Sequence, residues 1–297
     1  YPGASAADGR AVLEHTERLA AEFAGDRQIR LAFGPHAPYT CSPDLFREVA
    51  SRAARLGLPV QVHLSETASE VRESVARFGR SPVAHVARLG LFEVPVLVAH
   101  CNHPTDDDVE LLARHRAAVA HNPVSSLKLG AGIAPIPRLR AADVPLALGT
   151  DSVASNNNLD LFEEIKLAAL LQRGLHESPD IVLGADCVAM ATNEGAEAVG
   201  FPEVGRLEVG RWADIVVLDA SQPHATPLHS AMSYLAFAAR GSDVRHVFIG
   251  GRHVVADGVV TTLDEQEICH RVRETAARIT SGLPPRSDTS FPPADRS

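Results

Sequence analysis

Residues 60–66 read Val-Gln-Val-His-Leu-Ser-Glu, a short apolar run that ends in a histidine followed three residues later by a glutamate. Two later runs also end in a polar side chain: residues 96–100 read Val-Leu-Val-Ala-His, and residues 145–151 read Pro-Leu-Ala-Leu-Gly-Thr-Asp. Short apolar runs without strict alternation are typical of strands buried on both faces of a parallel sheet. These stretches therefore predict an α/β fold with polar side chains at the ends of its strands.

Strands and helices alternate over the first two-thirds of the chain. The predicted strands cover residues 29–33, 60–64, 96–99, 118–120 and 145–148. A helix is predicted over residues 43–56, because Ser42 is a good N-cap, Pro43 suits the first helical position and Gly57 can end the helix. Five β/α units follow one another in this part of the sequence.

A polar residue lies at or just after the end of each predicted strand. These residues are His36, His63, His100, His121 and Asp151. The active site of a (β/α)8 barrel lies at the carboxyl ends of its strands, and so does the site of a doubly wound sheet. The sequence contains no glycine-rich phosphate loop of the GxGxxG or GxxxxGK type. We therefore favour the barrel.

The pattern changes after residue 204. Residues 213–218 and 244–250 resemble strands, Gly250 and Gly251 predict a hairpin, and helices are expected near residues 228–239 and 264–280. The tail from residue 284 is rich in Pro, Ser, Asp and Arg and is predicted to be disordered. The expected domains are a partial barrel at 1–204, the C-terminal part of a composite β-sandwich at 205–263, and a helix with a disordered tail at 264–297.

The composition limits the partners. With 37 acidic and 28 basic residues the formal net charge is −9, which disfavours nucleic acid and anionic membranes. The chain has no apolar run of roughly 20 residues and no signal-peptide pattern at its first residues. The four cysteines are widely spaced and form no CxxC pair, as expected of reduced thiols in a cytoplasmic protein; they are Cys41, Cys101, Cys187 and Cys269.

Imidazole and carboxylate side chains at neighbouring strand ends suit a divalent metal. His63, His100 and Asp151 offer nitrogen and oxygen donors of the kind that zinc takes, and Glu66 can serve as a separate acid or base. Each also has a structural alternative, because a histidine after a strand is more often hydrogen-bonded and an Asp after Gly-Thr is often a turn or cap. The functional interpretation therefore depends on the order of several groups.

Several motifs resemble the amidohydrolase superfamily. They are Gly34-Pro35-His36-Ala37-Pro38-Tyr39, His63-Leu64-Ser65-Glu66-Thr67, Ala99-His100-Cys101, His121-Asn122-Pro123, Leu127-Lys128-Leu129-Gly130 and Gly149-Thr150-Asp151-Ser152. Residues 154–161 are most similar to methylthioadenosine/S-adenosylhomocysteine deaminases, a group related to the triazine hydrolases. The resemblance covers about residues 9–260. It implies a (β/α)8 TIM barrel of the metallo-dependent hydrolase type with a small C-terminal β-sandwich.

The resemblance also implies roles for five residues. His63 and Asp151 would bind the metal, expected to be one Zn²⁺ per complete site with Fe²⁺ or Mn²⁺ as alternatives. Glu66 would bind the substrate and protonate a ring nitrogen, and Asp151 would also take a proton from the attacking water. His100 would orient that water, and His36 would contact the substrate. The implied reaction is hydrolysis of a carbon–nitrogen bond in a cyclic amidine, with release of ammonia from a nucleoside-type small molecule.

The sequence departs from the family pattern at two places. The family's metal site begins with a His-x-His pair after the first barrel strand, and this sequence contains no such pair. Counting back, His36 would follow the fourth strand, so about strands four to eight are expected here. We therefore expect the 297 residues alone to bind zinc weakly and to lack measurable activity unless another chain supplies the missing segment. The second departure is Ser126, where the family usually has asparagine before Leu-Lys-Leu.

Three other functions remain open from the sequence. The chain is compatible with another amidohydrolase, such as an aminofutalosine or guanine deaminase or a triazine-type chlorohydrolase. It is also compatible with a non-catalytic scaffold, although Glu66 beside a ligand carboxylate argues against this. An inactive fragment is the third. The sequence leaves the oligomeric state open, including a homo-oligomer.

Overall fold

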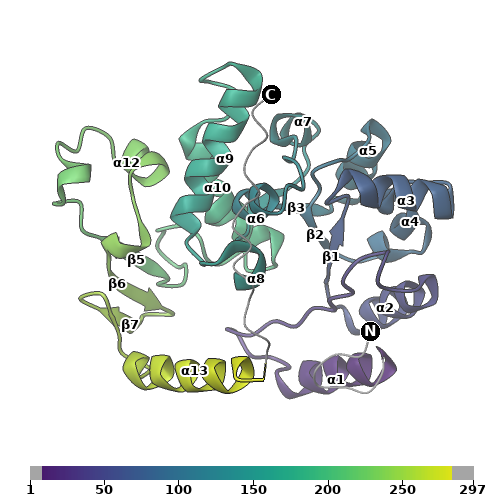
Figure 1. Cartoon of the computed structure of the whole chain (residues 1–297), viewed down its shortest axis with the longest axis horizontal. Coiled ribbons are helices and arrows are strands. Elements are labelled where there is room, and N and C mark those ends of the chain that lie inside the picture. The colour runs from purple at the N-terminus through teal and green to yellow at the C-terminus, as the bar shows by residue number, and fades with distance from the viewer. Residues whose placement is uncertain (1–8, 283–297) are drawn as a thin grey trace.

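The computed structural model describes residues 9–282, and its centre is a parallel sheet with strand order β1-β2-β3-β4 (Figure 1). The strands are β1 (Val60–Leu64), β2 (Val96–His100), β3 (Ala118–His121) and β4 (Leu146–Leu148). Each neighbouring pair is parallel and in register, for example His63 beside Ala99 and Val119 beside Leu146. The carboxyl ends of all four strands therefore meet at one edge of the sheet.

Helices supply the apolar side chains that cover this sheet. On β1, Val60, Val62 and Leu64 are fully buried, while Gln61 and His63 point to the opposite face. In Figure 1, α2 to α5 lie to one side of β1 to β3, and α9 and α10 lie between this sheet and a second one. The helices up to α11 are α1 (Gly9–Glu22), α2 (Pro43–Leu56), α3 (Ala68–Phe78), α4 (Pro82–Arg88), α5 (Asp106–His115), α6 (Pro123–Lys128), α7 (Ile136–Ala141), α8 (Val153–Asn156), α9 (Leu161–His176), α10 (Gly184–Ala191) and α11 (Asn193–Ala198).

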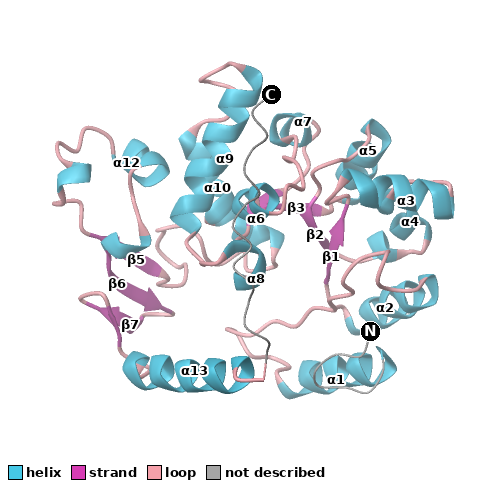
Figure 2. Ribbon diagram, in the orientation of Figure 1, coloured by secondary structure: helices cyan, strands magenta, loops and turns pink. Residues whose placement is uncertain are grey.

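The second sheet is antiparallel, with strand order β5-β6-β7-β8 (Figure 2). Its elements are β5 (Ile215–Leu218), β6 (Val244–Ile249), β7 (Arg252–Ala256) and β8 (Val259–Val260), with α12 (Ala231–Phe237) between β5 and β6 and α13 (Glu265–Thr280) after β8. Gly250 and Gly251, both at positive φ, form the β6–β7 turn as predicted. Every residue of α13 is exposed.

Most predicted elements are confirmed, but the predicted strand at residues 29–33 is wrong. Only Phe33 pairs with the sheet, through an isolated bridge to Val60, and Ile29 is exposed. Pro35, which has no N–H, comes two residues after the bridge and prevents the ladder from continuing past it. Residues 29–32 pair with no strand of the described structure. Four strands and one bridge thus replace the five predicted strands. The predicted disordered tail from residue 284 lies outside the described residues.

Two further sequence observations can be compared with the described structure. Among residues 9–282, no helix is long and apolar enough to cross a membrane. All four cysteines are free, with Cys101 and Cys187 buried.

Candidate metal and catalytic site

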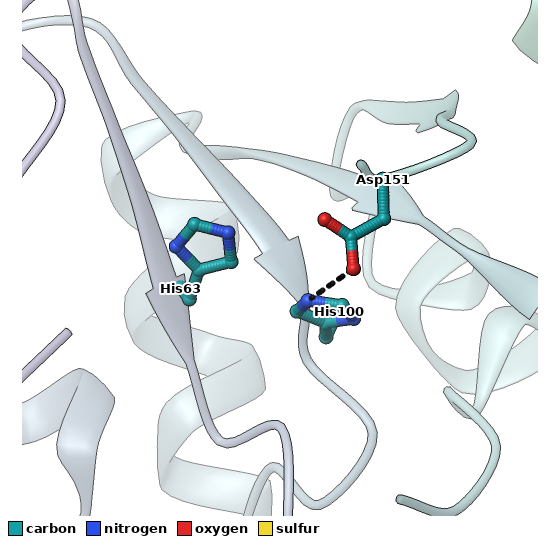
Figure 3. Close-up of side chains that lie close together, drawn as sticks. All are labelled: His63, His100 and Asp151. Carbon is teal, nitrogen blue, oxygen red and sulfur yellow. Dashed lines mark ion pairs between the residues drawn. The ribbon is translucent and has the colours of Figure 1, made fainter. Parts of the chain in front are cut away.

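Three side chains converge at the carboxyl edge of the parallel sheet (Figure 3). His63 comes from β1, His100 from the end of β2, and Asp151 from the loop after β4. One potential ligand atom from each lies within 4.8 Å of the others. The Nε2 atom of His100 is 4.0 Å from Oδ2 of Asp151 and 3.8 Å from Oε1 of Glu66. The structure therefore brings together all four residues that the sequence placed at a metal and catalytic site.

Hydrogen bonds orient both imidazoles toward the shared space. Nδ1 of His63 lies 2.9 Å from the backbone oxygen of His36, so it donates there and Nε2 keeps its lone pair. The Asn122 amide nitrogen donates to the oxygens of Gly149 (3.0 Å) and His121 (3.3 Å), which turns its amide oxygen toward Nδ1 of His100. Metal-binding histidines are usually fixed in this way by a partner on the other ring nitrogen. The donor set fits a divalent metal.

Asp151 is held as a carboxylate by three donors. The hydroxyls of Ser125 and Ser155 each donate to Oδ2 at 2.7 Å, and the backbone N–H of Ser152 donates to Oδ1 at 2.8 Å. Burial alone would raise the pKa of Asp151, but these hydrogen bonds outweigh it and hold the pKa below its usual value. The group is therefore charged at neutral pH, as a metal ligand must be.

Glu66 lies in a loop whose backbone is fixed by another glutamate. The Glu70 carboxylate accepts the N–H groups of Ser65 (3.1 Å) and Glu66 (2.7 Å), and the Asn102 side chain donates to the backbone oxygen of Glu66 (3.0 Å). Burial raises the pKa of Glu70 to about 7, although its hydrogen bonds with the backbone of residues 65–67 oppose this rise. The Glu66 side chain is partly exposed and free to meet a substrate.

His36 extends the row of imidazoles. Its ring centroid is 4.9 Å from that of His63, which in turn is 5.5 Å from that of His100. Burial and the neighbouring His63 lower the pKa of His36, and burial lowers that of His100. Both rings are therefore expected to be neutral at neutral pH.

His121 is not part of this group. Alternation along β3 places Ala120 and Asn122 on the cavity side of the sheet and His121 on the helix side. Its ring is fully buried, neither ring nitrogen has a partner among the described residues, and burial lowers its pKa to about 3. We assign it no role in the site.

A cavity of about 490 Å³ opens beside the metal donors. It is lined by His63 and Asp151 together with small residues of the strands, including Ala99, Ala120 and Ala147. The cavity also extends along the inner face of the strands to Gln61 and Leu97. The metal donors therefore border the open inner face of the sheet.

Three strand ends at the site have left-handed backbone at residues other than glycine. The φ angles are 53° at Ser65, 70° at His100 and 60° at Asp151. Such conformations are disfavoured for L-residues and concentrate at functional sites.

The comparisons with known proteins identify the family of this chain. Residues 3–254 match the Amidohydrolase family, a span of most of the sequence. The chain belongs to the amidohydrolase family. The family resemblance read from the sequence motifs is thereby confirmed.

Named amidohydrolase relatives align with most of this chain. The 5-methylthioadenosine/S-adenosylhomocysteine deaminase of Moorella thermoacetica is 45% identical over 250 residues, covering 84% of this chain and 58% of the relative. The 5'-deoxyadenosine deaminase of Methanopyrus kandleri is 41% identical over 253 residues, covering 85% of this chain and 59% of the relative. This chain thus spans less than two-thirds of the length of these relatives.

Solved amidohydrolase structures have the same fold. A zinc-bound adenosine deaminase from Xanthomonas campestris superposes with a TM-score of 0.91 at 35% identity, covering 95% of this chain and 64% of that one. The zinc complex of atrazine chlorohydrolase from Arthrobacter aurescens gives 0.83 at 25% identity, covering 90% and 60%. The α/β fold with its parallel sheet is therefore the TIM-barrel type of this family.

Proposed function

We propose that this chain carries most of the active site of a metal-dependent deaminase. The substrate class is an adenosine derivative such as 5'-methylthioadenosine or S-adenosylhomocysteine. The observation that carries the proposal is the convergence of His63, His100, Asp151 and Glu66 at one edge of the sheet. The names of the Moorella and Methanopyrus relatives support the substrate class.

In this proposal His63 and Asp151 hold the metal, which we take to be zinc, with Fe²⁺ or Mn²⁺ as alternatives. A bound divalent metal lowers the pKa of water, so that a nucleophile is available at neutral pH. His100, whose Nε2 faces both carboxylates, orients the attacking water. His36, the outermost imidazole of the row, contacts the substrate.

Glu66 and Asp151 divide the proton transfers. Water adds to the amino-bearing carbon of the ring, Asp151 takes a proton from that water, and Glu66 gives a proton to the adjacent ring nitrogen. Asp151 then gives its proton to the leaving amino group and Glu66 takes the remaining proton of the added hydroxyl. The carbon–nitrogen bond breaks, ammonia leaves, and the ring carbon keeps a carbonyl oxygen. Glu66 suits its role because its side chain is partly exposed while Glu70 fixes its backbone.

The test uses the 297-residue chain and a fusion that joins it to the parts of the Moorella relative that it does not span. Ammonia release is measured with 5'-methylthioadenosine, S-adenosylhomocysteine, guanine and aminofutalosine, and chloride release is measured with atrazine. We expect the fusion to prefer the two adenosine derivatives and its Asp151→Asn variant to be inactive. Preference for guanine, aminofutalosine or atrazine would support the alternative amidohydrolase functions, and an inactive fusion would support a scaffold.

We further propose a barrel completed by polypeptide outside the described residues, a composite β-sandwich at 205–263, weak zinc binding by the 297 residues alone, homo-oligomer formation and cytoplasmic residence. The four free cysteines support the last of these. Weak zinc binding is supported by the small number of donors: the described site offers three, and the sequence has no His-x-His pair that could supply further imidazoles.

A further inference from the structure

The two hydroxyls that hold Asp151 come from separate short helices. Ser125 lies on α6, which has six residues, and Ser155 lies on α8, which has four. Helices this short have little stability of their own in water. Their position against Asp151 must therefore depend on contacts with the rest of the protein.

One buried carboxylate that the proposed reaction does not use connects both helices. Glu164, on α9, is fully buried. Its Oε2 accepts the backbone N–H of Val124 at 3.1 Å, and its Oε1 accepts the side-chain amide of Asn156 at 2.7 Å. Val124 directly precedes Ser125, and Asn156 directly follows Ser155.

Asn156 also reaches the chain on the other side of Asp151. The same amide nitrogen that donates to Glu164 donates to the backbone oxygen of Thr150 at 2.7 Å. Glu164 therefore connects, directly or through Asn156, the segments before and after Asp151 and the segment that carries Ser125. It makes no hydrogen bond or ion pair to Asp151 itself among the described contacts.

We propose that Glu164 is a positioning residue that sets the orientation of the Asp151 carboxylate by holding Ser125 and Ser155 against it. The metal-binding role of Asp151 in this inference rests on the proposed function. A carboxylate suits the task because both of its oxygens accept, and here each faces one donor. A glutamine of the same shape would turn an NH₂ group toward one of these donors. Burial raises the pKa of Glu164 to about 7, against the effect of its two donors.

The first test compares Glu164→Gln with Glu163→Gln, a matched control. Glu163 is the exposed neighbour on the same helix and binds only the Asn158 side chain among the described side-chain contacts. Zinc affinity is measured by calorimetric titration of the fusion enzyme with zinc chloride. Loss of an outer partner typically weakens metal binding about 10–100-fold, so we expect at least about 10-fold for Glu164→Gln and no change for Glu163→Gln. Equal affinities in the two variants would overturn the proposal.

A double-mutant cycle tests the route through the serines. In the Ser125→Ala/Ser155→Ala background, Glu164→Gln should have no further effect on zinc affinity, because the hydroxyls it positions are gone. A loss of the same size in both backgrounds would show that Glu164 acts by another route and would overturn the proposal. A purely structural role would lower the melting temperature without this dependence on the serines.

Amide hydrogen exchange separates this inference from the proposed function. If the wild-type fusion binds no zinc, the proposed metal site fails, but the N–H groups of Val124 and Ser152 still report the positioning. Glu164→Gln should speed exchange at both at least about 10-fold relative to Glu163→Gln, because Ser152 donates to Asp151. Unchanged exchange at Ser152 would contradict the inference. If Glu164→Gln does not fold, Asn156→Ala should speed exchange at Ser152 while leaving Val124 protected.

Discussion

Glu66 lies next to the metal donors without belonging to them, so its replacement should separate catalysis from metal binding. We expect Glu66→Gln in the fusion enzyme to lower turnover about 10²–10⁴-fold, because the amide keeps the shape but cannot transfer a proton. Zinc affinity should be unchanged. The matched control is Glu73→Gln, an exposed glutamate on α3. Full turnover in the Glu66→Gln variant would exclude the proposed proton transfer.

The roles of His63 and His100 can be distinguished by metal titration. We expect His63→Gln and Asp151→Asn to weaken zinc binding by more than the roughly 10–100-fold that follows loss of an outer partner. His100→Gln should keep its zinc affinity within a few-fold and lose turnover in the fusion. A loss of zinc affinity in His100→Gln as large as in His63→Gln would instead make His100 a third ligand. This outcome is compatible with the structure, because the ligand atoms of His63, His100 and Asp151 lie within 4.8 Å of one another.

Among the helices, α2 and α9 provide a matched pair of glycines. Gly57 ends α2 at φ 65°, whereas Gly174 lies within α9, and a Cβ atom at either position would meet nothing within 4 Å. Gly57→Ala should lower the free energy of unfolding by roughly 1–2 kcal/mol because of its left-handed backbone. Gly174→Ala should raise it by about 0.4–1 kcal/mol through the unfolded state. Urea denaturation measures both, and changes of the same sign would contradict this account.

The elements that the sequence predicted well are those with local signals. The α2 helix begins and ends as expected, because the Ser42 hydroxyl accepts the Leu45 N–H and Gly57 takes the left-handed position. The strand at residues 60–64 was also predicted with its correct bounds. The strand predicted at residues 29–33 was wrong because a regular strand there depends on pairing with other segments, and only Phe33 pairs.

The sequence predicted those residues of the candidate site that lie at or just after the ends of strands. Parallel strands bring His63, His100 and Asp151 to one edge, so their grouping follows from sequence order. Asn122 was missed, although it follows the predicted strand at 118–120 and the same rule could have found it. The positions of Ser125, Ser155 and Glu164 depend on how α6, α8 and α9 pack, and no local pattern in the sequence indicates that packing.

For the molecule as a whole, Glu70 and Glu164 should make stability depend on pH. Their folded pKa values of about 7 exceed the usual value of 4.5, so the folded protein binds more protons than the unfolded chain between these values. This contribution to stability is complete below about pH 4.5 and is lost as the pH rises through about 7.

This pH dependence is tested by comparing the free energy of unfolding of the wild type with that of the Glu70→Gln/Glu164→Gln double variant. The free energy of unfolding of the wild type, relative to that of the variant, should fall between about pH 4.5 and 7 and level off above it. Urea denaturation at several pH values checks this. Histidines with lowered pKa values contribute equally to both proteins, so the difference isolates the two glutamates. A difference that does not change with pH would show that folding does not raise the pKa values of these carboxyls.

The left-handed backbone at Ser65 has a consequence for directed evolution. Its side chain is fully buried, its hydroxyl has no partner among the described residues, and its φ of 53° suits glycine. Ser65→Gly should therefore raise the melting temperature while allowing the backbone before Glu66 more freedom. A library selected only for heat resistance would enrich glycine at this position and accumulate variants with poorer turnover. Selection for product formation after heating would retain serine.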